Sequence, residues 1–343
     1  MVIPTHGRPG FLRSALASVA SQTRVDLVRE VIVSENGTDD RSRAVCGEFA
    51  TLPIRYVQRV PELDVPTHFV TVAADTNCPF VALLADDDMW SRYHLEEAER
   101  SFASRSDIVA FIASCVVVRN ESRHVTGEFN PTIESILWPG TGGISAFETW
   151  SASKMYLECL VLTPLNMWAV VSRRKPLLHA LADWQGRSRA YDSDRILLCE
   201  LARQGVVAVG TEVGFFHRLH PGSETASYEE VPNDLDRAAG ETTRMIVSDA
   251  ESDGIPIRNE WQAAIAAMSA TQRAQYRSRA LPGARVALAA LWGEDVFGVS
   301  DRPDVLSRAK KVCRSLCPPF VWSATRRACE ILVGWIHGVR SSE

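Results

Sequence analysis

Short apolar runs alternate with helical stripes over the first 90 residues of the chain. The runs predict strands at residues 1–4, 30–34, 54–57 and 80–85, and a helix is expected over residues 66–76. An apolar stripe at helical spacing predicts another helix after the first strand, and it consists of Phe11, Leu12, Ala15, Leu16 and Val19. Strands that alternate with helices in this way are typical of a parallel α/β sheet flanked by helices.

The fourth apolar run leads directly into three carboxylates, Asp86, Asp87 and Asp88. Burying three anions without partners would cost far more free energy than the strand contributes. We therefore expect this acidic triplet at the C-terminal end of a strand, facing a cation. A hard divalent ion with oxygen ligands fits that position, and a solvated acidic turn is the structural alternative.

Polar loops follow the first and second predicted strands as well. They cover Thr5 to Arg8 and Glu35 to Asp40. In a parallel sheet, ligands bind outside the carboxyl ends of the strands, so both loops and the acidic triplet are expected around one crevice. Neither a GxGxxG nor a GxxxxGK[ST] sequence occurs in these loops, which argues against a dinucleotide fold and a P-loop.

Composition narrows the class of protein. The chain has 343 residues and a net charge of -5, so nothing in its charge favours nucleic acid as a partner. The eight cysteines form no CxxC pair, which favours a reducing compartment over a disulfide framework or a zinc ribbon. No apolar run reaches the ~20 residues that span a bilayer. We expect a cytoplasmic protein without a signal peptide, with contact at the inner face of the cell membrane as an open alternative.

Five segments of this sequence resemble, in order, the motifs of family-2 glycosyltransferases. Residues 3–9 (IPTHGRP) resemble IPTYNRP, residues 31–40 resemble IIVSDNGSTDD, and residues 84–90 resemble the LSDDD segment with its DxD motif. Residues 191–198 resemble EDxDLxLR, which holds the catalytic base of the family, and residues 216–223 resemble YYRxHPGS. The resemblance covers about residues 1–225. It implies a GT-A fold, a Rossmann-like, mainly parallel sheet, a nucleotide-sugar donor and a Mg or Mn ion.

The resemblance also implies roles for the residues of the crevice. Asp88 is the expected metal ligand, and Asp86 is expected to contact the ribose or a metal-bound water. Asp87 belongs to the same nucleotide site, with the start of a neighbouring helix as its alternative role. Thr5 and Glu35 are expected to line the nucleoside pocket. Arg8 is assigned to phosphate, and an ion pair that holds its own loop is equally compatible with the sequence.

The acceptor side needs a general base, and the resemblance assigns it to Asp192. Asp194 is the alternative, and either carboxylate is also suited to capping the helix that follows. The expected reaction is a single displacement that inverts the anomeric centre, in which Asp192 takes the proton of the acceptor hydroxyl. His217 and His220 are placed in a loop. His220 is expected to bind the metal or the diphosphate, with a hydrogen bond inside the loop as the alternative.

Four tryptophans lie between the acidic triplet and Asp192, where an acceptor pocket is expected. They are Trp138, Trp150, Trp168 and Trp184. Aromatic faces suit sugar rings, but buried tryptophan more often packs in a core. We therefore predict that one or two of them contact the acceptor.

We divide the chain into a catalytic domain, residues 1–227, and a helical appendage, residues 228–343. Within the catalytic domain, residues 1–100 are the nucleotide-sugar half and residues 101–227 the acceptor half. In the appendage, residues 305–340 carry seven basic residues against one acid, Glu330, together with Trp322 and Trp335. Such a basic amphipathic segment is compatible with peripheral membrane contact, with packing on the catalytic domain and with a homodimer interface.

The sequence thus predicts a metal-dependent, inverting glycosyltransferase that moves a sugar from a nucleoside-diphosphate sugar to a hydroxyl. A saccharide or lipid-linked acceptor is expected, in the biosynthesis of a polysaccharide, a glycolipid or a glycosylated metabolite. Two alternatives stay open. A sugar-phosphate nucleotidyltransferase uses related carboxylates but normally opens with a Gly-rich loop that this chain lacks. A non-catalytic carbohydrate-binding protein of the same fold would be expected to have a degraded acidic triplet, and here the triplet is complete.

Overall fold

The computed structural model divides the chain into two compact units, Met1–Phe297 and Gly298–Glu343. It describes residues 1–119, 147–162, 165–187, 194–220, 222–223, 232–293 and 296–297. The predicted membrane-contact segment, residues 305–340, lies outside these residues. Within the described residues, no helix has both the length and the apolar character needed to cross a membrane.

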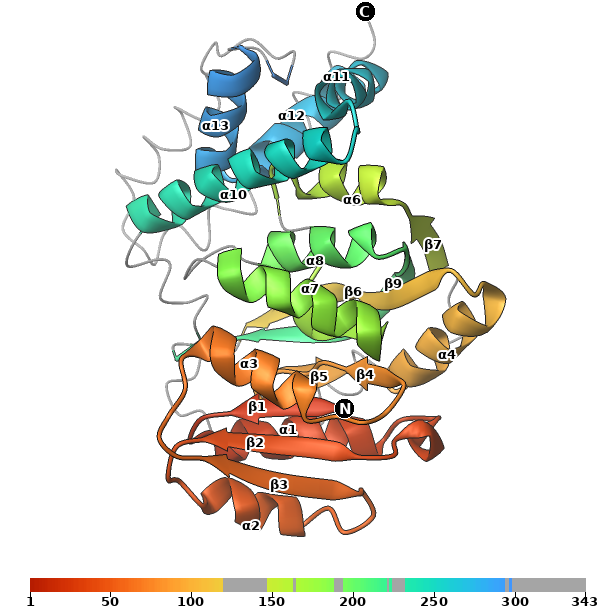
Figure 1. Ribbon diagram of the computed structural model, residues 1–343, viewed down its shortest axis with the longest axis vertical. Helices are drawn as coiled ribbons and strands as arrows, with labels where there is room; N and C mark the ends of the chain where they lie inside the picture. The colour runs from red at the N-terminus through yellow and green to blue at the C-terminus, as the bar shows by residue number, and fades with distance from the viewer. Residues whose placement is uncertain are drawn as a thin grey trace, which may run out of the picture. The chain divides into compact units, whose positions relative to one another are not determined.

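The N-terminal part of the first unit is a three-stranded parallel sheet with helices against it (Figure 1). It contains β1 (Val2–Thr5), β2 (Val31–Asn36) and β3 (Ile54–Arg59). The helices are α1 (Pro9–Ala20), α2 (Arg41–Gly47) and α3 (Val65–Ala74). In α1 the residues of the predicted apolar stripe are all buried, so that helix is confirmed. The alternation of strand and helix predicted for this part of the chain is confirmed too.

A second, six-stranded sheet follows, and its strands run in both directions. It is built from β4 (Phe80–Ala82), β5 (Met89–Trp90), β6 (Ile108–Arg119), β7 (Phe147–Trp150), β8 (Val170–Arg173) and β9 (Val206–Leu219). The order is β4-β8-β6-β9-β5, with β7 on β9. Only β6 and β9 pair in parallel among the pairs of this sheet, and the other pairs are antiparallel. The fold is a mixed α/β fold with helices on its sheets, as expected.

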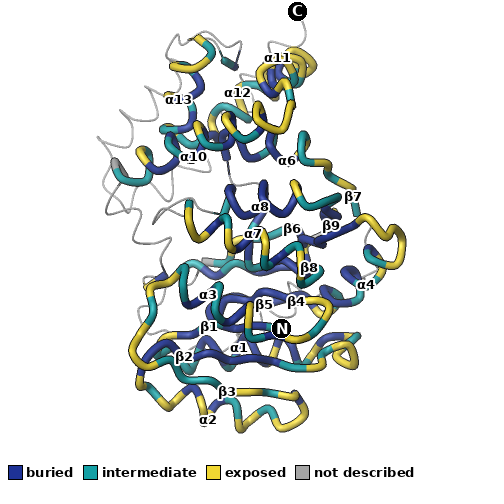
Figure 2. The backbone as a smooth tube through the Cα atoms, viewed as in Figure 1, coloured by how far each residue is buried: buried dark blue, intermediate teal, exposed yellow. Residues whose placement is uncertain are grey.

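The two sheets meet at a single point next to the acidic triplet. Val2 in β1 forms a parallel bridge with Leu83, and the Leu84 amide donates to the Val2 carbonyl at 3.2 Å. The predicted strand at 80–85 therefore ends as a strand at Ala82, because the chain then leaves β8 to reach β1. Figure 2 shows that the strands around this junction are buried.

Helices pack on the second sheet and connect it to a helical layer. They are α4 (His94–Ser104), α6 (Ala152–Cys159), α7 (Arg174–Arg187) and α8 (Asp194–Arg203), with short 3-10 turns at Val25–Leu27 and Met167–Ala169. The apolar residues predicted to make residues 196–202 helical lie in α8 and are buried. In Figure 1, α8 lies between the second sheet and α6.

Four further helices, α10 (Pro232–Ser252), α11 (Ile257–Ala267), α12 (Ala270–Arg279) and α13 (Pro282–Trp292), belong to the first unit. The helical character predicted for this region is confirmed, and it includes the 21-residue helix α10. Its buried positions are mostly small or polar, and they are Ala238, Ala239, Thr242, Thr243, Ile246, Val247 and Ala250. They recur at helical spacing, so the periodicity was present without the usual large side chains.

The strand β9 extends farther than the sequence analysis predicted, because His217 was expected in a loop. Residues 206–209 and 213–216 are not two segments followed by a loop, because β9 runs without a break from Val206 to Leu219. Its pairing with β6 shows register shifts near Ser114. At these irregularities β9 has more residues than β6, which accommodates the polar residues between its two apolar runs. His217 and Arg218 consequently lie on a strand, and only His220 follows it.

Candidate active site

The acidic triplet lies where the two sheets meet, on the wall of a cavity of about 460 Å³. All three aspartates are buried, with exposed fractions of 5%, 9% and 1% for Asp86, Asp87 and Asp88. Of the other expected site residues, Thr5, Arg8 and His217 also line this cavity. A volume of this size suits a ligand as large as a nucleotide.

Asp86 is held from the first strand. Its Oδ2 accepts from the Thr5 hydroxyl at 2.7 Å, and its Oδ1 lies 3.5 Å from Arg8 Nη1. Burial and the neighbouring charge of Asp87 raise the pKa of Asp86 to about 7, although Arg8 and Thr5 act in the opposite direction. Because burial and a neighbouring anion disfavour the ionised form of Asp86, a further cation close to it would stabilise that form.

Asp87 is paired with two cationic or potentially cationic groups. Its Oδ2 accepts from Arg8 Nη1 at 3.0 Å and lies 3.2 Å from His220 Nε2. Burial opposes the charged form, but the hydrogen bond with His220 and the charge of Arg8 outweigh it, and the pKa of Asp87 is lowered. His220 Nδ1 in turn accepts from the Gly222 amide at 3.2 Å, so both of its ring nitrogens already have partners.

Asp88 has one engaged and one unengaged oxygen. Its Oδ1 accepts from the Arg218 amide at 2.8 Å and lies 3.1 Å from His217 Nδ1. Its Oδ2 is buried and has no hydrogen-bond partner. Burial is the main reason that the pKa of Asp88 is raised to about 6; the bond from His217 lowers it, and the charge of Asp87 adds to the increase.

The donor set of the triplet fits a hard divalent ion. A buried carboxylate oxygen without a partner is costly, and a metal ion with oxygen ligands satisfies it directly. Within the described residues, no three His, Cys, Asp or Glu side chains are grouped as a complete metal site. Asp88 Oδ2 is therefore the best-placed protein ligand, and phosphate oxygens and water would have to supply most of the rest, as is usual for Mg²⁺.

One wall of the cavity comes from the end of β2 and the segment before α3. The Asn36 side chain donates to the Leu63 carbonyl and accepts from the Leu63 amide, at 2.8 and 2.9 Å. His68 lies beside them, 2.9 Å from the Ser34 hydroxyl, and burial lowers its pKa to about 4. Asn36 lies in the loop that was expected at the crevice, but nothing in the sequence signals that its side chain fixes Leu63.

The described tryptophans of this region have three different environments. Trp168 lines the cavity, with its ring 4.6 Å from that of Phe69. Trp184 is buried in the core, edge-on to Phe69. Trp150 lies on β7 under the ammonium of Lys154, and Trp138 falls outside the described residues. Trp168 is thus the tryptophan in a position to contact a ligand.

Glu35 does not line the cavity. It is buried at 1% exposure, and its two oxygens accept from the Gly7 amide at 2.8 Å and from the Ser42 hydroxyl at 2.6 Å. In the structure this carboxylate therefore organises the loop after β1 and the start of α2. Gly7 has a φ of +64°, a conformation that suits glycine and brings its amide to Glu35.

The loop after β1 and the end of β9 are joined over the triplet. Arg8 Nη2 donates to the Gly222 carbonyl at 3.2 Å, and the ring of Phe11 stacks on His220 with centroids 4.2 Å apart. The buried guanidinium of Arg218 lies 5.1 Å from the centre of the same Phe11 ring. These contacts place three cationic or potentially cationic side chains, Arg8, Arg218 and His220, around the acidic triplet.

The expected base, Asp192, lies outside the described residues. Asp194 begins α8. Burial acts to lower the pKa of His217, but the hydrogen bond with Asp88 and the charges of Asp88, Asp87 and Asp194 raise it overall.

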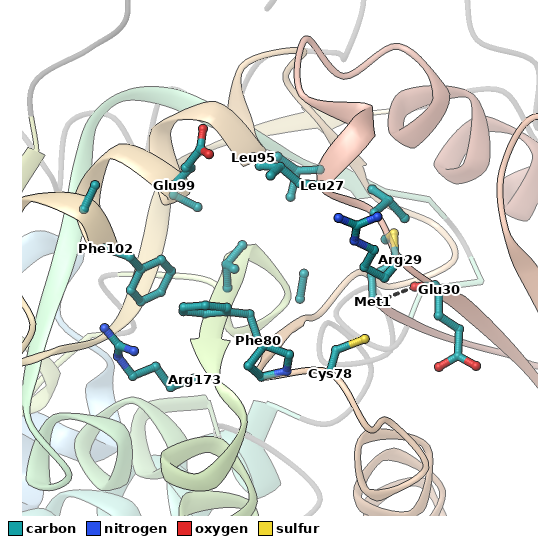
Figure 3. Close-up of a pocket in the computed structure, with 16 residues that line it drawn as sticks. Met1, Leu27, Arg29, Glu30, Cys78, Phe80, Leu95, Glu99, Phe102 and Arg173 are labelled. Carbon is teal, nitrogen blue, oxygen red and sulfur yellow. Dashed lines mark hydrogen bonds between the residues drawn. The ribbon is translucent and has the colours of Figure 1, made fainter.

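A second cavity, of about 470 Å³, has a different character (Figure 3). The rings of Phe80 and Phe102 lie on it, 4.7 Å apart, and the guanidinium of Arg173 is placed over both. Its lining is mostly apolar and includes Leu27 and Leu95. None of the expected site residues lines it, so the cavity at the acidic triplet is the candidate active site.

Comparisons with known proteins concern the family and the fold. Residues 1–158 match the model of the family described as glycosyl transferase family 2. No curated protein matches the chain significantly.

Several solved structures are similar to this chain, and one of them, with a TM-score of 0.52, supports the fold. The crystal structure of S. aureus TarS 1–349 in complex with UDP-GlcNAc matches with a TM-score of 0.52 at 13% identity, over 86% of this chain and 88% of that one. The complex of TarS 1–349 with UDP gives a TM-score of 0.47 at 13% identity, with the same coverage. A further S. aureus TarS structure is 15% identical with a TM-score of 0.44, and the match covers 70% of this chain but only 38% of that one. Residues 1–158, a little less than half of the chain, are therefore similar to glycosyl transferase family 2.

Proposed function

We propose that this protein is a metal-dependent, inverting glycosyltransferase that uses a nucleoside-diphosphate sugar as donor. The observation that carries the proposal is the buried, unpartnered Oδ2 of Asp88 at a cavity large enough for a nucleotide. Asp88 is the proposed metal ligand, and Asp86 the proposed contact for the ribose or a metal-bound water. When bound, the ion would neutralise the negative charge that develops on the departing diphosphate.

The side chains around the triplet have complementary tasks in this proposal. Thr5 holds Asp86, and His217 and the Arg218 amide hold Asp88, so both carboxylates are fixed before the donor arrives. Preorganised groups of this kind need no rearrangement during the reaction. Arg8 is exposed enough, at 35% of its side chain, to exchange Asp87 for a phosphate oxygen. Glu35 acts in this scheme by shaping the nucleoside loop, since its carboxylate binds Gly7 and Ser42.

The donor and the acceptor lie on different sides of the triplet in this proposal. The nucleoside would lie against Asn36, Leu63 and His68, and a uridine diphosphate sugar is the first candidate because TarS was crystallised with UDP-GlcNAc. Trp168 would offer an aromatic face to a sugar ring. The acceptor hydroxyl, on a saccharide or a lipid-linked saccharide, would transfer its proton to Asp192 as it attacks the anomeric carbon. A role in polysaccharide, glycolipid or glycosylated-metabolite biosynthesis follows from that class of acceptor.

A thermal-shift panel tests the donor and the metal together. The full chain is heated with nucleoside diphosphates and nucleotide sugars, in Mn²⁺ and in chelator. A ligand at 100 times its Kd stabilises the fold by about 2.7 kcal/mol, so the matching nucleotide raises the unfolding temperature visibly. We expect this increase only in Mn²⁺. Equal stabilisation in chelator would remove the metal from the proposal, and no stabilisation by any nucleotide would remove the nucleotide-sugar donor.

The proposed base is tested by Asp192→Asn. This variant is expected to retain metal-dependent nucleotide binding and to lose at least about 100-fold in transfer, since general-base catalysis contributes about that much. The matched variant Asp194→Asn, two residues on, separates the two candidate carboxylates. Full transfer by Asp192→Asn together with loss in Asp194→Asn would move the base to Asp194.

A further inference from the structure

The second cavity has an apolar lining that is partly exposed to solvent (Figure 3). It has a volume of about 470 Å³ and is lined by residues of β4, β8, α4 and the segment that precedes β2. Phe80 and Leu27 in this lining each keep 38% of their surface exposed. Concave apolar sites of about 300–1,000 Å³ are where proteins bind small molecules. Of the described residues, none lines both this cavity and the one at the acidic triplet, so the two would hold separate ligands.

Arg173, at the end of β8, brings a guanidinium to this cavity. Its Nε donates to the Ile108 carbonyl at 2.8 Å, and its guanidinium carbon lies 5.3 and 5.5 Å from the ring centres of Phe80 and Phe102. Neither of its Nη atoms has a hydrogen bond or an ion pair with any residue that the structure describes. The N–H groups of these two nitrogens lie in one plane, a geometry that matches the oxygens of a carboxylate or a phosphate. The lining therefore contains a cation that is available to an anionic ligand.

The acidic residues of the lining are already paired with cations outside it. Glu99 pairs with Arg24, and Glu30 accepts from Arg55 Nε at 2.7 Å. Arg29 adds a second cation to the lining, and in Figure 3 it lies across the cavity from the two phenyl rings. The remaining charge of the described lining is therefore positive, and charge complementarity favours an anion over a neutral or cationic ligand.

The rest of the lining favours an apolar ligand. Leu95, Ala98 and Val171 contribute hydrocarbon surface to it, together with the two phenyl rings. A small inorganic anion would leave this surface in contact with water, and a pure hydrocarbon would desolvate the guanidinium of Arg173 without offering it an acceptor. Only a ligand that has both an apolar body and an anionic head satisfies both parts of the lining.

We propose that this cavity binds a small amphipathic anion, whose carboxylate or phosphate head accepts hydrogen bonds from Arg173 and whose apolar chain lies against Phe80 and Phe102. A free fatty acid and an alkyl phosphate share this chemistry. The proposal does not rest on the proposed function, because Asp86 and Asp88, the proposed nucleotide and metal contacts, line the other cavity. It gives the chain a second ligand site, with a lipid-like ligand in place of a nucleotide.

Calorimetry on the full chain, without metal or nucleotide, tests the two parts of the ligand separately. The probes are octanoate, octyl phosphate and octanol, each below the concentration at which it aggregates. We expect a single site for octanoate or octyl phosphate, and the one that binds more tightly identifies the head group. Octanol has the same chain without the charge and should bind at least about ten-fold more weakly, because hydrogen bonds with a charged group contribute about that factor or more.

Variants of Arg173 test the contact with the head group. Arg173→Met removes the charge and keeps an unbranched apolar chain, so it should weaken octanoate binding at least about ten-fold and leave octanol binding within about two-fold of wild type. Arg173→Lys keeps the charge and should still bind octanoate more tightly than octanol. Arg105→Met is the matched control, because Arg105 is exposed, pairs with Asp107 and does not line the cavity. It should keep both affinities within about two-fold of wild type.

A thiol in the lining reports where the probe binds. Cys78 lines the cavity and is half-buried, whereas Cys46, also half-buried, lies on α2 outside it. With octanoate at about ten times its Kd, about a tenth of the chains are free, so alkylation of Cys78 by iodoacetamide should be about ten-fold slower. Cys46 should react at an unchanged rate, and mass spectrometry of the labelled peptides measures both thiols.

Any of four results would overturn the proposal. They are no binding of either anion, octanol binding as tight as that of both anions, wild-type affinity for octanoate in Arg173→Met, and alkylation of Cys78 at the same rate with and without octanoate. If Arg173→Met does not fold, the comparison of probes on wild type and the alkylation of Cys78 still decide. None of these measurements uses a nucleotide or a metal, so their failure would not count against the proposed glycosyl transfer.

Discussion

Replacing Asp88 by Asn should remove metal binding without destabilising the fold. Burial and the charge of Asp87 raise the pKa of Asp88 from 3.8 to about 6, so its ionised form is unfavourable in the folded state above pH 6. At 1.36 kcal/mol per pKa unit, the shift corresponds to about 3 kcal/mol of lost stability at pH 8. Asn removes this cost and can still accept the hydrogen bond from the Arg218 amide.

The substitution also introduces a cost of its own. The new amide nitrogen takes the place of an oxygen without a partner, and a buried, unsatisfied N–H costs about 1–3 kcal/mol. Subtracting this cost from the stability gained by removing the charge, we expect the free energy of unfolding of Asp88→Asn at pH 8 in chelator to lie between that of wild type and about 2 kcal/mol above it. Because Asp88 in the folded wild type becomes protonated as the pH falls through about 6, this advantage should be smaller at pH 5 by roughly 1 kcal/mol.

Urea unfolding followed by tryptophan fluorescence measures this prediction. Wild type and Asp88→Asn are compared at pH 8 and pH 5 in chelator, and again at pH 8 with Mn²⁺ and a nucleotide that binds wild type. With the nucleotide at 100 times its Kd, the free energy of unfolding of wild type should rise by about 2.7 kcal/mol, and that of the variant should not rise. Asp107→Asn, at an exposed ion pair with Arg105, is the control and should stay within about 0.5 kcal/mol of wild type.

A variant clearly less stable than wild type in chelator would refute the electrostatic account of Asp88. A variant that keeps its Mn²⁺-dependent stabilisation would show that another group binds the metal. The two results are independent, because the first is measured without metal or nucleotide and the second is measured with both bound.

Three further predictions use the same kind of measurement. Arg8→Met should lower the unfolding temperature in chelator, because Asp87 loses its cation, and saturating Mn²⁺ should restore it; equal loss in both buffers would contradict this. Gly283→Ala should cost more than about 2 kcal/mol in urea unfolding, because a Cβ there would lie 1.6 Å from the Asp236 carbonyl oxygen, and a neutral result would refute the close approach of α13 to α10. Burial lowers the pKa of His94 to about 3, so between pH 6.5 and about 4 only the unfolded chain binds a proton at this residue, and the free energy of unfolding falls as the pH falls. In His94→Phe this fall should be smaller by up to about 1.4 kcal/mol per pH unit. An unchanged dependence on pH would contradict the prediction.

The parts of the fold that large apolar residues mark were predictable from the sequence. The stripe from Phe11 to Val19 and the run from Val31 to Val33 have regular spacings, and the structure buries them as expected. The helix α10 lies in the region predicted to be helical, but alanine and threonine fill much of its buried face, so no stripe of large apolar residues fixes its bounds in the sequence. The continuation of β9 to Leu219 was missed because charged and polar residues occupy the end of a strand whose partner is β6.

The acidic triplet of the candidate site was predictable from the sequence, but the hydrogen-bond partners of the carboxylates were not. The triplet followed from the cost of placing carboxylates after an apolar run. The hydrogen bonds of Asp88 come from residues that lie about 130 positions later, and no local pattern announces them. Glu35 shows the same limit, because only the fold reveals that Gly7 and Ser42 use its carboxylate.

The pairing of β5 with β9 has a consequence for synthesis of the protein. The sheet of β1, β2 and β3 uses only the first 59 residues, so it can assemble early as the chain leaves the ribosome. Asp88 receives the Arg218 amide only after β9 has been made, 130 residues later. At the 5–20 residues per second typical of translation, the three carboxylates wait roughly 6–26 s for that strand. The acidic triplet therefore gains this hydrogen-bond donor well after the strands of the first sheet have been synthesised.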